Sequence, residues 1–124
     1  MKTKIILLLS IIVLATACKN TKSTQKKEDT YRVIVSFISK GEGPDAKTQA
    51  TLESYLITYA KKIKKSTIVY DKIPYGKEGE VDYCFYCKEM KKAQQKDFVA
   101  GLTNLTKEAP LVVVKENAVC AHKK

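Results

Sequence analysis

The pattern of apolar and polar residues along the chain predicts six secondary-structure elements, in the order strand, helix, strand, strand, helix, strand. Short runs rich in β-branched and aromatic residues predict the strands, and apolar residues recurring every three or four positions predict the helices. The strands are expected at 31–39, 67–73, 80–87 and 111–114, and the helices at 44–65 and 89–107. Pro44 suits the first helical position, with Asp45 in the first turn, and Pro110 ends the second helix.

This order of elements predicts a ferredoxin-like βαββαβ domain, an α+β fold with two helices on one face of a four-stranded antiparallel sheet. In the usual spatial order 4-1-3-2, the first strand lies in the interior of the sheet, which agrees with its apolar sequence. Turn residues at 74–79 predict that the second and third strands form a hairpin. The fold alone does not determine a function.

The third strand is expected to present different residues on its two faces, because successive side chains of a strand point to opposite sides. The side facing the helices would carry Val81, Tyr83, Phe85 and Cys87. The open side would carry Glu80, Asp82, Cys84 and Tyr86. We expect Arg32 of the first strand to meet Glu80 or Asp82 on the open side, in an ion pair of small effect on stability.

The first 17 residues have the layout of a secretory signal, in which Lys2 and Lys4 precede an apolar stretch that is too short to span a bilayer. Residues 14–18 resemble the lipobox of bacterial lipoproteins, in which a signal peptidase cleaves before a cysteine that carries diacylglycerol. The resemblance implies a mature protein anchored to a membrane by lipid on Cys18, in the cell envelope, facing the periplasm or the cell exterior.

After Cys18, residues 19–30 contain no apolar residue and are expected to form a disordered tether. A single domain of residues 31–124 follows. Loss of Lys2 and Lys4 with the signal lowers the formal charge from +10 to +8. The basic residues are scattered lysines that close the first helix and open the second, with a single arginine and no tryptophan. This distribution argues against nucleic-acid binding and leaves an anionic surface or an envelope protein as partner.

With Cys18 lipidated, three cysteines remain in an oxidising compartment, where disulfides form. Cys120 is expected to pair with the third strand. Cys84 is the favoured partner, because a tail returning over the open face meets no helix, and Cys87 is the alternative. A second hypothesis is a soft-metal site for zinc or copper, made by Cys84, Cys87, Cys120 and His122.

No catalytic constellation is predicted. His122, the single histidine, lies close to the C-terminus, where side chains are rarely held in position as a base. A carboxylate site of Glu78, Glu80 and Asp82 stays open as a third hypothesis. We therefore expect a non-catalytic binding or interaction module without a cofactor, and soft-metal binding is the alternative.

The domain also resembles small lipoproteins of unassigned function that occur mainly in Bacteroidota. The resemblance rests on residues 35–39 with Gly41 and Gly43, on 76–84, and on 116–117 with Cys120. It spans most of the domain. It implies an envelope lipoprotein and offers no reaction or ligand.

Overall fold

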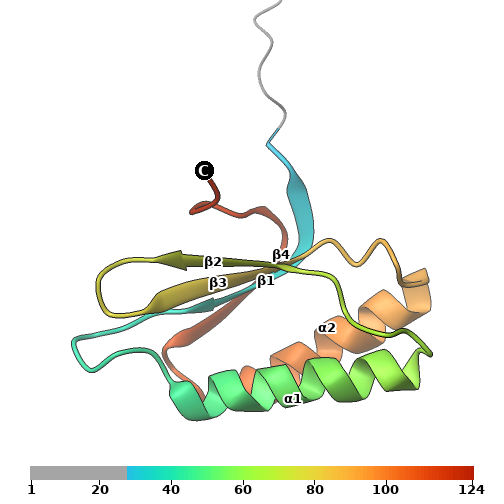
Figure 1. Ribbon diagram of the computed structural model, residues 1–124, viewed down its shortest axis with the longest axis horizontal. Helices are drawn as coiled ribbons and strands as arrows, with labels where there is room; N and C mark the ends of the chain where they lie inside the picture. The colour runs from blue at the N-terminus through green and yellow to red at the C-terminus, as the bar shows by residue number, and fades with distance from the viewer. Residues whose placement is uncertain (1–27) are drawn as a thin grey trace, which may run out of the picture.

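The computed structural model describes residues 28–124, which form a four-stranded antiparallel sheet with both helices on one face (Figure 1). The elements are β1 (Thr30–Phe37), α1 (Ala46–Lys62), β2 (Asp71–Tyr75), β3 (Glu80–Phe85), α2 (Lys92–Thr106) and β4 (Val112–Val119). The strand order β2-β3-β1-β4 confirms the predicted ferredoxin-like α+β fold. The signal segment, Cys18 and most of the expected tether lie outside the described residues. Within residues 28–124, no helix has the length and apolar character needed to cross a membrane.

All six elements differ from the predicted bounds by a few residues, and in three places the structure shows a local reason. Asp45 is the cap of α1 and not part of its first turn, because its side chain accepts a hydrogen bond from the Thr48 amide at 2.9 Å. Pro74 lies inside β2, which tolerates proline because it is an edge strand. β4 continues to Val119, where it pairs with Thr30 and so follows β1 along its whole length.

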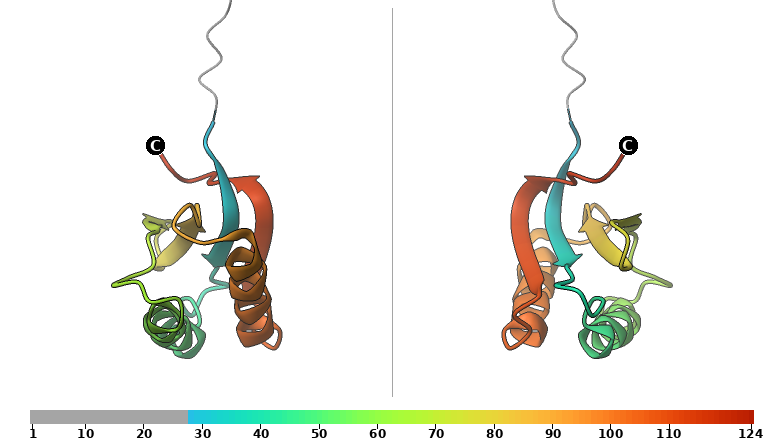
Figure 2. Two further views of the ribbon diagram at one scale, coloured as in Figure 1. Left: turned by 90° about the vertical axis from the view of Figure 1, so that its right-hand side faces the viewer. Right: turned by 90° about the vertical axis from the view of Figure 1, so that its left-hand side faces the viewer.

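The hydrophobic core lies between the sheet and the two helices, which run side by side beneath it (Figure 2). Phe98 of α2 is fully buried and packs against Tyr55, Tyr59 and Phe85, with ring centroids 5.0 to 5.7 Å apart. The predicted alternation along β3 is confirmed. Tyr83 and Phe85 belong to this core, whereas Cys84 belongs to a smaller buried cluster on the open side.

The beginning of β1 departs from regular alternation, and this makes the predicted contact of Arg32 wrong. Tyr31 is buried on the open side with Cys84, whereas Arg32 lines a hollow along α2. Its guanidinium donates to Glu116 at 2.7 Å, not to Glu80 or Asp82. The pairing of β1 with β4 skips Arg32 and the residue opposite it, Asn117, whose φ of 49° is left-handed. This irregularity directs Arg32 to the helix side.

We predict that Phe98→Ala lowers the free energy of unfolding by about 3 to 5 kcal/mol, because it leaves a cavity among three aromatic rings. Ile57→Ala is the matched control on α1, since Ile57 is 61% exposed, and it should change stability by less than about 0.5 kcal/mol. Urea unfolding measures both. Equal stability of the two variants would contradict the packing described here.

Candidate functional site

The C-terminal tail, residues 120–124, lies on the side of the sheet opposite the helices (Figure 1). It turns immediately after β4, and the Lys123 amide donates to the Cys120 carbonyl at 3.1 Å. The tail then contacts β1, β3 and β2 through the side chains of Cys120, His122 and Lys123. It therefore covers part of the face that the helices leave open.

A disulfide joins Cys120 to Cys84 of β3, with α-carbons 6.3 Å apart. Both cysteines are buried, next to Tyr31 and Ile34. The favoured pairing from the sequence is therefore confirmed. Because the bond closes a loop with a sequence separation of 36, the chain-entropy model gives a stabilisation of about 3 to 4 kcal/mol.

His122 and Asp82 form the second contact of the tail. The Nδ1 atom of His122 lies 2.6 Å from Oδ2 of Asp82, whose side chain is only 3% exposed. The imidazole also stacks on Tyr75, with ring centroids 3.6 Å apart. The expectation that His122 would not be held in position is wrong, because Asp82, Tyr75 and the nearby disulfide hold it. The other carboxylate oxygen, Oδ1 of Asp82, has no hydrogen-bond partner within the described part of the chain.

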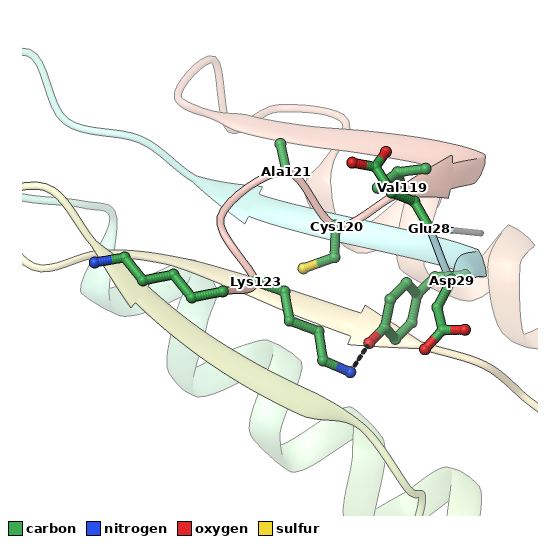
Figure 3. A pocket seen from close by; sticks show the side chains of 8 residues that line it. Glu28, Asp29, Val119, Cys120, Ala121 and Lys123 are labelled. Carbon is green, nitrogen blue, oxygen red and sulfur yellow. Dashed lines mark hydrogen bonds between the residues drawn. The ribbon is translucent and has the colours of Figure 1, made fainter. Parts of the chain in front are cut away.

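Lys123 forms the third contact, with Tyr31 and Asp71. Its ammonium donates to the Tyr31 hydroxyl at 2.7 Å, the dashed line in Figure 3. It also donates to Asp71 at 2.9 Å, and the Tyr31 hydroxyl donates to Asp71 at 2.5 Å. Hydrogen bonds from Tyr31 and then Lys123 lower the pKa of Asp71. Burial, followed by the bond to Asp71, raises the pKa of Tyr31. The group binds the end of the tail to β1 and β2.

The tail and the start of β1 also border an open hollow of about 540 Å³ (Figure 3). Its lining combines the acidic Glu28 and Asp29 with the basic Lys123 and Lys124. Because both signs of charge are present, the hollow carries no preference for an anion or a cation.

The structure does not assemble the metal site expected from Cys84, Cys87, Cys120 and His122. Cys87 is buried in the core under the helices, whereas Cys84 and Cys120 are bonded to each other on the opposite side. Asp82, which the sequence placed on the open face but not among the metal ligands, has its carboxylate with both sulfur atoms in a group spanning no more than 4.8 Å. Its position two residues before Cys84, on the same face of β3, is the signal that could have identified it.

The acidic residues of the β2–β3 turn hold loops together and do not form a carboxylate site with Asp82. Glu78 accepts hydrogen bonds from the Ser39 hydroxyl and from the Gly41 amide. Glu80 accepts from the Glu78 amide at 3.0 Å. The Glu78 carboxylate therefore connects the turn to the loop that precedes α1, whereas the Glu80 carboxylate closes the turn on itself.

A second candidate site lies at the far end of the helical layer, where the last turn of α1 meets the start of α2 (Figure 1). A hollow of about 380 Å³ is lined there by four exposed lysines, which we call the lysine cluster: Lys62, Lys64, Lys65 and Lys91. Lys62 also pairs with Asp97 at 2.6 Å. Glu89 in the same hollow accepts from the Val69 amide. Lysines that are scattered in the sequence are therefore gathered by the packing of the two helices.

Comparisons with protein-family models, with curated proteins and with solved structures found no match. The functional proposals below rest on the residues and geometry of this chain.

We predict that peptide mapping without reduction recovers Cys84 linked to Cys120, and that Cys87 is alkylated only after unfolding. Burial raises the pKa of the Cys87 thiol to about 12, so the reactive thiolate is scarce in the native protein even near pH 10. Alkylation of the native protein should be at least about a hundredfold slower than in urea. Rapid native labelling of Cys87, or free Cys84 and Cys120, would refute the assignment.

Proposed function

We propose that the protein is a lipid-anchored envelope protein whose domain is a non-catalytic module that binds an anionic surface. The observation that carries the binding proposal is the lysine cluster, which gathers four positive side chains in one hollow. The anchoring proposal rests on the secretory signal and on the lipobox ending at Cys18.

The disulfide supports a location in the envelope. Disulfides form and persist in oxidising compartments and are rare in the reducing cytosol. The Cys84–Cys120 bond is buried, and it links β3 to the C-terminal tail. A buried disulfide that links the C-terminal segment to β3 is suited to an exported protein.

The lysine cluster supports binding of an anion with several charged groups. Lys64 and Lys65 follow α1, and Lys91 caps α2, whose first turn contains no acidic residue. The amide groups at the start of a helix add positive potential there. Lysine ammonium groups bind phosphate or carboxylate as point charges, and each contributes about 1 kcal/mol near an anionic surface. Such binding needs no deep pocket and weakens with salt.

The placement of His122 supports a non-catalytic role. Its Nδ1 atom is committed to Asp82 and its ring is stacked on Tyr75. Within residues 28–124, no serine or free thiol is hydrogen-bonded to His122. The histidine therefore serves to hold the tail on the sheet.

Binding is tested with a triple variant of the lysine cluster. We predict that Lys64→Gln, Lys65→Gln and Lys91→Gln together lower the affinity for anionic ligands about a hundredfold, since three charges are lost at about 1 kcal/mol each. The soluble form is residues 28–124, which contains every described strand and helix. Sedimentation with phosphatidylserine vesicles and retention on a carboxylated polysaccharide distinguish the two sources of anionic groups.

The control is a triple variant with the same charge change at the opposite end of the molecule, made at the exposed Lys40, Lys47 and Lys77. It should bind like the wild-type domain. Equal losses in both triple variants would show that only net charge matters, and this would contradict a defined site. Absence of binding to both ligands at low salt would overturn the proposal.

Anchoring is tested separately at Cys18. We predict that Cys18→Ala abolishes incorporation of labelled fatty acid and prevents cleavage before residue 18, because the modified thiol is lost. Lys19→Ala is the neighbouring control and should be processed normally. Mass spectrometry of the membrane fraction measures both outcomes, and an unmodified Cys18 in the wild-type protein would refute lipid anchoring.

A further inference from the structure

The open face of the sheet brings together three side chains of the kinds that bind zinc, and a fourth, His122, lies beside one of them. Three ligand atoms lie within 4.8 Å of one another: one carboxylate oxygen of Asp82 and the sulfur atoms of Cys84 and Cys120. His122 adds an imidazole nitrogen 2.6 Å from Asp82. Two sulfur ligands, one nitrogen and one oxygen form a donor set that suits tetrahedral Zn²⁺.

A second observation at the same place is the unpaired oxygen of Asp82. The residue is only 2% exposed, and its Oδ1 atom has no hydrogen-bond partner within residues 28–124. Buried carboxylate oxygens are normally satisfied, because desolvation of the charge is costly. A metal ion is one of the partners that can satisfy such an oxygen.

We propose that Asp82, Cys84, Cys120 and His122 form a redox-gated zinc site, which exists when the Cys84–Cys120 disulfide is reduced. The disulfide and the metal site use the same two sulfur atoms, so the two states exclude each other. This inference does not depend on the lysine cluster or on the lipid anchor.

The chemistry balances with a dithiol as reductant. The dithiol transfers two electrons and two protons to the Cys84–Cys120 bond, yielding two thiols, and is itself converted to a disulfide. Zn²⁺ then displaces the two thiol protons and binds the two thiolates. In the reverse step a small-molecule disulfide accepts two electrons from the thiolates and two protons from water and becomes a dithiol, the Cys84–Cys120 bond forms again, and the zinc ion is released.

The two sulfur atoms remain close after reduction, because other interactions also hold the tail. β4 pairs with β1 as far as Val119, the residue before Cys120. Beyond it, Lys123 binds Tyr31 and Asp71. The α-carbons of the two cysteines are 6.3 Å apart. Zn–S bonds of about 2.3 Å place two thiolates about 3.8 Å apart in a tetrahedral site, which small rotations of these side chains can reach.

Asp82 and His122 distinguish this site from a simple pair of thiols. Their oxygen and nitrogen atoms favour Zn²⁺ over Cu(I), which prefers sulfur ligands. Both side chains are already placed before the metal binds, Asp82 by burial in the sheet and His122 by stacking on Tyr75. Cys87 is excluded, because it lies in the core on the helix side.

The test uses the full-length chain, purified in detergent. A phosphine reduces the disulfide, and the phosphine is converted to its oxide with an oxygen atom from water. Competition against a chromophoric chelator measures zinc affinity, and Co²⁺ replaces zinc as a spectroscopic probe. We expect the reduced protein to bind one equivalent of Zn²⁺, and its Co²⁺ form to show thiolate charge-transfer and tetrahedral d–d bands. The oxidised protein should retain no zinc.

Matched variants assign the ligands. Asp82→Asn and His122→Gln should each weaken zinc binding at least about tenfold. Glu80→Gln makes the same carboxylate-to-amide change two residues away on the same face of β3, and Cys87→Ser removes the remaining thiol of the domain. Both should bind zinc like the wild type. Absence of cobalt–thiolate absorption, or affinity in Asp82→Asn or His122→Gln equal to that of Glu80→Gln, would overturn the site.

Discussion

The bond between Cys84 and Cys120 fixes the arrangement of the open face of the sheet. Both helices pack on the other face, so the open face carries no second layer of secondary structure from residues 28–124. The disulfide holds a short tail there, and the tail brings His122 to Asp82 and Lys123 to Asp71. The disulfide removes conformational freedom from the unfolded chain, and so it adds to the hydrogen bonds of His122 and Lys123 that also hold the tail.

The open face of the sheet and the helical layer carry different kinds of side chains. The chain enters the domain at Glu28, beside the tail and on the opposite side of the sheet from the helices (Figure 1). Sulfur, carboxylate and imidazole groups gather on the open face. The lysine cluster lies on the helical layer, at the end where α1 closes and α2 begins. The redox-gated zinc site that we propose at the tail and the lysine cluster at the helix ends therefore lie in different parts of the domain.

The sequence correctly predicted the faces of elements whose apolar residues recur at a regular spacing. Alternation along β3 correctly assigned Tyr83 to the core and Cys84 to the open face, and from this the disulfide partner followed. The same alternation, applied to β1, placed Arg32 on the wrong face, because the strand pairing is irregular at Arg32 and Asn117 and the spacing of apolar residues does not reveal this irregularity. The position of His122 also could not be predicted, since it depends on contacts from β2 and β3 that are 40 or more residues away.

The tail is held against the sheet in the oxidised protein, and nuclear magnetic resonance tests this most directly. We expect nuclear Overhauser contacts between the rings of His122 and Tyr75, which stack at 3.6 Å. We also expect the amides of residues 120–123 to be as rigid on the nanosecond timescale as those of β1. A tail without ring contacts, and with the fast motion of a free chain end, would contradict the account.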